Sequence, residues 1–192
     1  ETAVFTGHLN PDLDALASML GGMLLCYGAD APPHPLPSLK KDTTRPVLYL
    51  PSTYNEGIAK LLSLASDELE NGLVTRHIGD DEFVRLCNEE GLKRLIVSDT
   101  KSVPRLKHVA ALLDLPPDRQ LDSVSAVDHH PHSDSDLSGD NCTVITVRYG
   151  SVSSWFALEL KRALSSLSDS LSEAVADFAQ SVPASGAVAL IR

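Results

Sequence analysis

Residues 3–15 read Ala-Val-Phe-Thr-Gly-His-Leu-Asn-Pro-Asp-Leu-Asp-Ala and decide the fold. The apolar and β-branched residues at 3–6 are typical of a buried strand. The polar run that follows leads into residues 13–27, which are rich in Ala, Leu and Met and therefore predict a helix. A strand, a polar turn and a helix form the first half of a parallel β-α-β unit. Ligands bind beyond the carboxyl ends of parallel strands, so a site is expected at the turn.

The same alternation continues to about residue 165. Further strands are predicted at 47–50, 73–78, 95–97, 124–127 and 144–147, and further helices at 54–66, 80–90, 103–113 and 151–165. Strands that alternate with crossover helices are typical of parallel pairing. The pattern therefore predicts an α/β fold, a mostly parallel sheet with helices on both faces.

The composition indicates an acidic globular domain. Of the 192 residues, 43% are hydrophobic and 22% are charged, with 16 Lys and Arg against 26 Asp and Glu, for a net charge of -10. This balance of hydrophobic and charged residues argues against intrinsic disorder. Binding to long nucleic acid depends on many contacts from Lys and Arg to phosphates, so the negative charge argues against that class of partner.

The cysteines and the lengths of the apolar runs indicate in which cellular compartment the protein is expected. Cys26, Cys87 and Cys142 are odd in number and widely spaced, which favours reduced thiols in a cytoplasmic protein over a disulfide framework. No apolar run approaches the roughly 20 residues of a membrane span, and the first residues do not resemble a signal peptide. We therefore expect a cytoplasmic protein that does not bind membranes.

Three polar segments follow predicted strands. They are residues 7–15 after the first strand, residues 98–100 after the strand at 95–97, and Asp128-His129-His130 after the strand at 124–127. In one parallel sheet these segments converge at a single edge. Carboxylates held close together repel one another unless a cation neutralises them. Mixed carboxylate and imidazole ligands suit Mn²⁺, Fe²⁺ or Zn²⁺ better than Ca²⁺ or an all-oxygen Mg²⁺ site, so the sequence predicts a metal centre.

Each segment also has a simpler interpretation when taken singly. Asn10 or Asp12 can cap the first helix, Asp99 can cap another, and an isolated His pair is often exposed. The metal-centre prediction depends on the occurrence of all three segments at strand ends. It depends also on the first segment, where His8, Asp12 and Asp14 are spaced by four residues and then two.

The three segments carry a family resemblance. They read Gly-His-Leu-Asn-Pro-Asp-Leu-Asp-Ala-Leu-Ala-Ser at 7–18, Leu-Ile-Val-Ser-Asp-Thr at 95–100 and Val-Asp-His-His-Pro at 127–131. Together they resemble the N-terminal motifs of the DHH phosphoesterase superfamily. That superfamily includes RecJ-type exonucleases, nanoRNases, cyclic-dinucleotide phosphodiesterases, manganese-dependent family II inorganic pyrophosphatases and DHH domains fused to bacterial tRNA nucleotidyltransferases. The resemblance covers residues 1–165 and implies a Rossmann-like, three-layer metal-binding domain.

The resemblance also implies a set of metal ligands. It implies two Mn²⁺ ions, which Mg²⁺, Fe²⁺ or Co²⁺ can replace. By correspondence of motifs, His8 and Asp12 would hold one ion, Asp14 and His129 would hold the other, and Asp99 would bridge the two.

Other residues would act on the substrate. The resemblance implies that His130 is catalytic and contacts the substrate phosphate, and that Asp128 supports the neighbouring imidazoles as a hydrogen-bond acceptor. Arg105, shortly after the second motif, is a further candidate for contact with phosphate, although a solvated helix face is the favoured explanation for it. The implied activity is hydrolysis of short oligonucleotides or small phosphate esters by two-metal activation of water.

Two family features have no clear counterpart in the sequence. A fourth acidic motif is missing, and Asp177, the nearest acid by count, lies inside a helical pattern. We also expect no room within the 192 residues for the smaller domain that closes over the substrate in the family, and residues 166–192 are expected to be a helical segment or a truncated linker. These departures favour a non-catalytic regulatory or nucleotide-sensing domain, partnered by other domains of a longer chain or by a second copy. The form of the first motif favours a manganese-dependent pyrophosphatase as a further alternative.

Overall fold

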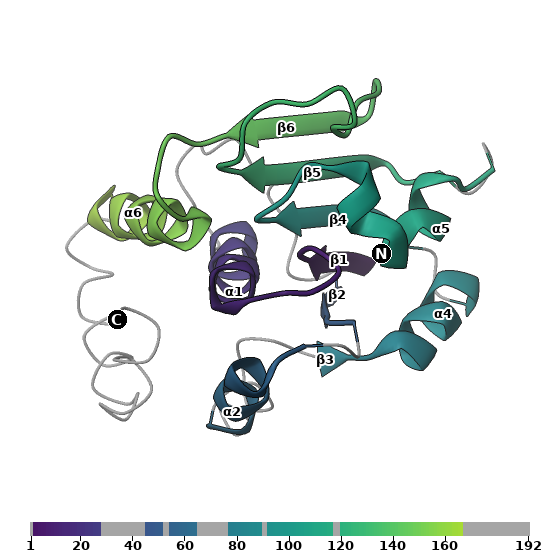
Figure 1. Cartoon of the computed structure of the whole chain (residues 1–192), viewed down its shortest axis with the longest axis horizontal. Coiled ribbons are helices and arrows are strands. Elements are labelled where there is room, and N and C mark those ends of the chain that lie inside the picture. The colour runs from purple at the N-terminus through teal and green to yellow at the C-terminus, as the bar shows by residue number, and fades with distance from the viewer. Residues whose placement is uncertain are drawn as a thin grey trace.

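A six-stranded sheet forms the centre of the molecule (Figure 1), in a computed structural model that describes residues 2–27, 45–51, 54–64, 77–89, 92–116 and 120–166. The strands are β1 (Thr2–Thr6), β2 (Arg45–Tyr49), β3 (His77–Ile78), β4 (Leu92–Ser98), β5 (Ser123–Asp128) and β6 (Cys142–Thr146). Every pair of neighbouring strands is parallel. The α-helices are α1 (Leu13–Tyr27), α2 (Glu56–Leu64), α4 (Asp80–Glu89), α5 (Ala110–Leu113) and α6 (Val152–Ser166), and η2 (Val103–Val109) is a 3₁₀ helix.

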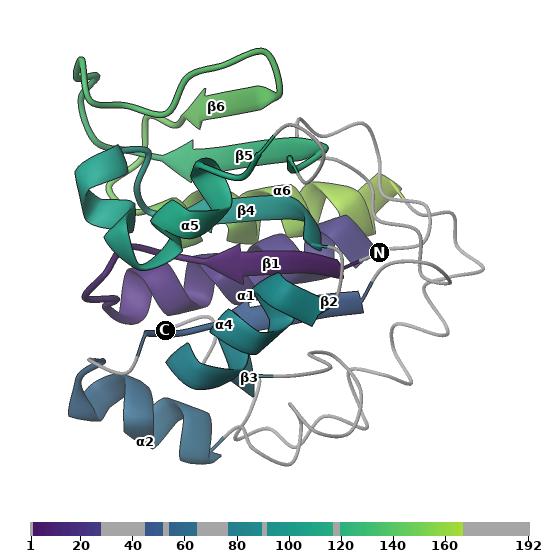
Figure 2. The same cartoon turned by 90° about the vertical axis from the view of Figure 1, so that its right-hand side faces the viewer.

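Helices cover both faces of the sheet, which confirms the predicted α/β fold (Figures 1 and 2). The central strand β1 is buried throughout, as expected for a parallel strand covered on two sides. Its side chains alternate between two cores. Phe5 packs into the core that α1, α2 and α6 share, where Phe156 also lies. Val4 packs into the core on the other face, together with Phe83 of α4.

The order of the strands changes direction next to β1. The order is β3-β2-β1-β4-β5-β6, so the chain runs outward from β1 to β3 and then returns to β4 on the other side. Open parallel sheets bind ligands at such a switch point, beyond the carboxyl ends of the strands. The register aligns Thr6 with Val97 and Ser98 with Val127. The segments that follow β1, β4 and β5 therefore begin side by side at one edge.

One predicted helix, at residues 103–113, is divided into η2 and α5. Pro104 fits the first turn, where a missing N–H is tolerated. Leu106, however, has φ of -108° and ψ of 19°, which is not helical. Leu106 is fully buried in the core beside α4, so tertiary packing sets the backbone there. Of the strand predicted at 73–78, only His77–Ile78 lies within the described residues.

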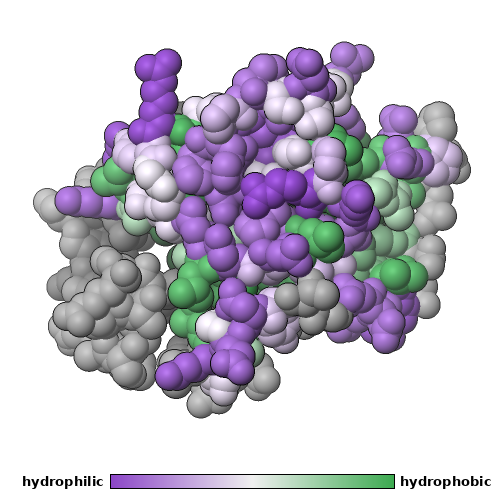
Figure 3. All heavy atoms as spheres, in the orientation of Figure 1, coloured by the Kyte–Doolittle hydropathy of each residue, from purple (hydrophilic) through white to green (hydrophobic). Residues whose placement is uncertain are grey.

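The surface and the cysteines have the properties expected of an acidic globular domain. The face of the molecule seen in Figure 3 is mostly hydrophilic, and its hydrophobic residues form small separate groups. None of the helices in the described residues is long and apolar enough to cross a membrane. Within the described residues none of the three cysteines forms a disulfide, and burial raises the pKa of the Cys26 thiol to about 12. That thiol is therefore protonated and inert at neutral pH.

Candidate metal centre

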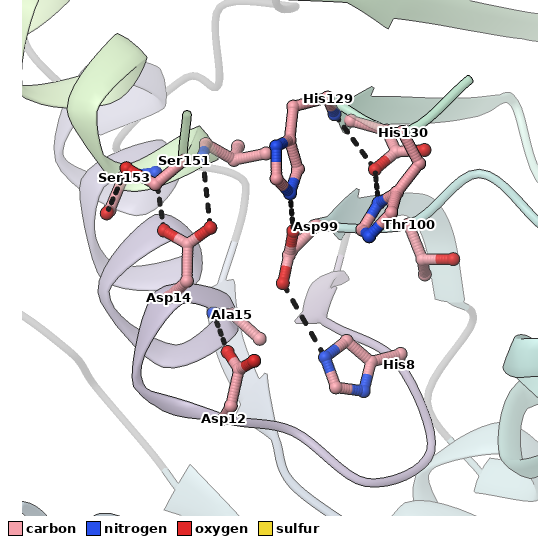
Figure 4. Close-up of polar contacts among 12 residues, drawn as sticks. His8, Asp12, Asp14, Ala15, Asp99, Thr100, His129, His130, Ser151 and Ser153 are labelled. Atoms are coloured by element: carbon pink, nitrogen blue, oxygen red, sulfur yellow. Dashed lines mark hydrogen bonds and ion pairs between the residues drawn. The ribbon is translucent and has the colours of Figure 1, made fainter. Parts of the chain in front are cut away.

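Asp99 lies at the centre of the candidate site (Figure 4). It follows β4 directly, and its backbone N–H donates a 2.9 Å hydrogen bond to the carbonyl of Val127 near the end of β5. Its φ of 62° lies in the left-handed region, which costs most residues about 1–2 kcal/mol but which Asp and Asn tolerate better. This backbone conformation places the carboxylate between the first and third motifs.

The two oxygens of Asp99 face two histidines. Oδ2 lies 3.5 Å from His8 Nε2, and Oδ1 lies 3.3 Å from His129 Nε2. Within the described part of the chain, neither His8 Nε2 nor Asp99 Oδ1 has a hydrogen-bond partner, although both atoms are buried. A buried polar atom left without a partner costs about 1–3 kcal/mol. Both residues belong to groups whose ligand atoms could hold a metal ion.

The ligand atoms form two overlapping groups. One group is His8, Asp12 and Asp99, the other is Asp99, His129 and His130, and the atoms of each group lie within 4.8 Å of one another. Ligands about 2.1 Å from an ion stand roughly 3.0–3.4 Å apart at octahedral or tetrahedral angles. The two contacts of Asp99, at 3.5 and 3.3 Å, are close to that range. The donor set therefore fits two divalent ions of the borderline type, with Asp99 shared between them.

The two acids of the first motif have different partners (Figure 4). One oxygen of Asp12 accepts a 3.0 Å hydrogen bond from the N–H of Ala15, so Asp12 caps α1 and also belongs to the first ligand group. Asp14 belongs to neither group. Its oxygens accept hydrogen bonds of 3.0 and 2.9 Å from the N–H groups of Val152 and Ser153 at the start of α6. The role of Asp14 as a metal ligand stays a prediction from the resemblance.

Asp14→Ala is expected to weaken the attachment of α6 to α1. Two N–H groups in the first turn of α6 would lose their acceptors, and the loss of a helix cap costs about 1–2 kcal/mol. The free energy of unfolding, measured in urea, should fall by this amount. Asp134→Ala is the control, because Asp134 is exposed in a loop. A variant at Asp14 that is as stable as this control would contradict the capping role.

A buried ion pair lies beside the ligand groups. Lys101 Nζ is 3.1 Å from Asp128 Oδ2, with the side chains 1% and 2% exposed, and it also donates to the carbonyl of His130. Asp128 Oδ1 accepts hydrogen bonds from His130 Nδ1 at 2.7 Å and from the N–H of His129 at 2.9 Å. Burial alone would raise the pKa of Asp128, but the hydrogen bonds from His130 and Lys101 outweigh it and lower the pKa. Asp128 thus contacts the ring of His130 but only the backbone of His129, and its supporting role stays a prediction.

Sequence reasoning did not find Lys101. Its only signal is its place two residues after Asp99, where a lysine suggests a solvated side chain. Arg105 was predicted to contact phosphate, and the structure fixes its backbone, because the N–H of Leu9 donates a 2.9 Å hydrogen bond to its carbonyl. The loop that carries Arg105 is therefore attached to the first motif, and its contact with phosphate stays a prediction.

A further histidine, His108, lies close to the first motif. Its Nε2 is 3.2 Å from Thr6 Oγ1. Burial lowers the pKa of His108 to about 4, and the nearby His8 acts in the same direction, against the opposing effects of Asp80 and of a backbone hydrogen bond at Gly7. His108 is therefore neutral in the folded chain at neutral pH.

Acid is expected to destabilise the fold through His108. The folded-state pKa, about 4, lies below the ordinary value of 6.5, so between these pH values the unfolded chain binds a proton that the folded chain does not. The free energy of unfolding should therefore fall as the pH decreases from 6.5 to 4. Urea titrations should show a weaker pH dependence for His108→Gln than for wild type. His132→Gln is the control, because that side chain is 83% exposed. Equal pH dependence in wild type and His108→Gln would contradict the assignment.

A scan against family models gives no match, and a search of curated proteins gives none either. The grouping of His8, Asp12, Asp99, His129 and His130 therefore rests on the geometry of the chain itself.

Proposed function

We propose that this chain is a metal-dependent phosphoesterase that hydrolyses short oligonucleotides or small phosphate esters. The observation that carries the proposal is the pair of buried atoms, His8 Nε2 and Asp99 Oδ1, without hydrogen-bond partners in the described residues and within two overlapping ligand groups. These groups lie at the switch point of the sheet, where such folds bind ligands. The likeness of the three motifs to those of DHH phosphoesterases supports the same reaction.

The chain supplies ligands and orientation. His8 and Asp12 would hold one ion, His129 would hold the other together with Asp14 or His130, and Asp99 would serve both. When bound, two divalent ions, Mn²⁺ in the first instance, polarise phosphate oxygens and lower the pKa of water. A chain with a net charge of -10 has few cationic groups to offer a phosphate, and the ions provide that charge locally.

His130 is placed to meet the substrate. Its side chain is 43% exposed, whereas that of its partner Asp128 is 2% exposed. An ionised carboxylate only accepts hydrogen bonds, so the 2.7 Å contact with Asp128 puts the proton of His130 on Nδ1. The other nitrogen, Nε2, then presents its lone pair to an ion, and it donates to a phosphate oxygen only when both ring nitrogens carry a proton.

His130→Ala is expected to keep the metal and to lose most turnover. Removal of a positioned group that transfers a proton to or from the reacting phosphate ester costs roughly 10²–10⁴-fold in rate. Metal content and rate are measured on the same sample, with His132→Ala as the exposed control. Unchanged turnover would contradict a substrate role, and loss of one ion would show that His130 is a ligand.

The proposed function is tested by titration with Mn²⁺ and assays on three substrates: a nucleotide dimer, a generic phosphodiester and pyrophosphate. Hydrolysis of the dimer or the diester that depends on Mn²⁺ and disappears in Asp99→Asn is the expected result. Hydrolysis of pyrophosphate alone would favour the manganese-dependent pyrophosphatase, which the His-x-Asn-Pro-Asp-x-Asp form of the first motif supports. Metal binding without turnover of any substrate would overturn an enzymatic function.

A regulatory or nucleotide-sensing domain is the second candidate. This candidate is favoured because Asp14 is hydrogen-bonded to the start of α6 and belongs to neither ligand group. The acid in the second ligand group is then Asp99, which that group shares with the first. Asp177, the nearest candidate for a fourth acid, lies outside the described residues, as do residues 167–192. For either function we propose a cytoplasmic location, in keeping with three cysteines that form no disulfide within the described residues.

A further inference from the structure

We infer that Lys101 is a positioning residue that fixes the orientation and tautomer of His130. The side chain of Lys101 is among the largest that are fully buried, with 1% of the residue exposed. An ammonium group is costly to bury unless it is paired and hydrogen-bonded. The residues that bond to the buried ammonium group show which side chain its burial holds in place.

The contacts of Lys101 converge on His130 by two routes. Directly, Nζ donates to the backbone carbonyl of His130. Indirectly, Nζ holds Asp128 Oδ2 at 3.1 Å, which leaves Oδ1 turned toward His130 Nδ1 at 2.7 Å. Backbone and ring of His130 are thus both fixed by one ammonium group. The hydrogen on Nδ1 is held by Asp128, so the lone pair of Nε2 is directed away from it.

Lys101 is itself held in place by its backbone. Its carbonyl accepts a 2.7 Å hydrogen bond from the N–H of Leu137, and the adjacent Ser102 forms an isolated antiparallel bridge with Asp136. The segment after β4 is therefore attached to the segment after β5 both by backbone bonds and by the ion pair. Such a scaffold keeps an imidazole in one orientation before any ligand arrives.

The consequence for the proposed reaction follows from the role of His130, and this part of the inference rests on the proposed function. His130→Ala is expected to keep the metal, so a variant that only disorients the His130 ring should keep it too. Lys101→Met should therefore lower turnover by up to the roughly 10²–10⁴-fold expected for His130→Ala, with the number of bound Mn²⁺ ions unchanged.

The test uses the metal-free protein and nitrogen NMR of its histidine rings at neutral pH. There are seven histidines, and the signals of His130 are assigned by their loss in His130→Gln. In wild type, His130 is expected to carry its proton on Nδ1. In Lys101→Met, a mixture of tautomers or a shift to Nε2 is expected. Lys93→Met is the matched control, because Lys93 forms a surface pair with Asp122 and is 38% exposed.

A folded Lys101→Met protein with an unchanged His130 tautomer would overturn the inference. If that variant does not fold, Lys101→Gln removes the charge of Lys101 and keeps Asp128 in place, and the same loss of a single tautomer is expected there. An unchanged tautomer in Lys101→Gln would overturn the inference too. The NMR readout involves no metal and no substrate, so failure of the phosphoesterase proposal would leave this result standing, and the reverse also holds.

Discussion

Asp99→Asn is expected to abolish tight binding of both metal ions and to leave the fold intact. Asparagine has the same shape and tolerates the left-handed φ of 62° at this position, so the backbone bond to Val127 should persist. The amide, however, lacks the negative charge that lets one carboxylate serve two ions. Loss of a residue that only supports a ligand costs about 10–100-fold in metal affinity, so loss of the shared ligand should cost more than about 100-fold.

The measurement is the number of Mn²⁺ ions retained after dialysis, together with the affinity from a titration. Asp140→Asn is the matched control, since Asp140 is exposed in a loop. Asp99→Ala is a poorer choice, because alanine would pay about 1–2 kcal/mol for the left-handed backbone and confuse loss of metal with loss of stability. Two ions retained by Asp99→Asn would refute the assignment of Asp99 as the shared ligand.

Lys101→Met is expected to lower the free energy of unfolding by about 3–5 kcal/mol, because it leaves the Asp128 carboxylate buried without its ion pair. This is a large part of the roughly 5–15 kcal/mol that stabilises a typical domain. The double variant that also carries Asp128→Asn should recover much of the loss, since no unpaired buried charge remains in it.

Urea titrations of the wild type, the two single variants and the double variant give the coupling energy of the pair. Lys93→Met, which removes a lysine from a surface pair, should change the stability by less than about 1 kcal/mol. If Lys101→Met were as stable as Lys93→Met, the ion pair would contribute nothing to the fold.

The helices and strands were predictable because the residue patterns that favour each of them lie within the element itself. The run at 3–6 and the Ala- and Leu-rich stretch after it became β1 and α1. The sheet order was not predictable, because nothing in β1 shows that Val4 pairs with Val47 on one side and with Leu95 on the other. The division of the helix at residues 103–113 was missed for a related reason. The backbone at Leu106 is set by a core that only the folded chain contains.

In the candidate site, too, some features were predictable from the sequence and others were not. The convergence of the three motifs at one edge was predictable, because carboxyl ends of parallel strands share an edge. The partners of Lys101 and Asp14 were not. Lys101 meets Asp128 across 27 residues of sequence, and Asp14 meets the start of α6 across 138 residues. Contacts over such separations leave no periodic signal in the chain.

The register of β1 against β4 also determines when the proposed metal centre could form. Thr6 lies opposite Val97, so the first motif meets Asp99 only after the chain has closed a long loop and β1 has paired with β4. Ions that need both motifs therefore bind the folded chain and not the unfolded one. At a free metal concentration of 100 times Kd, each such site adds about 2.7 kcal/mol of stability by mass action. The supply of metal would then control how much folded protein a cell keeps, in addition to how fast that protein works.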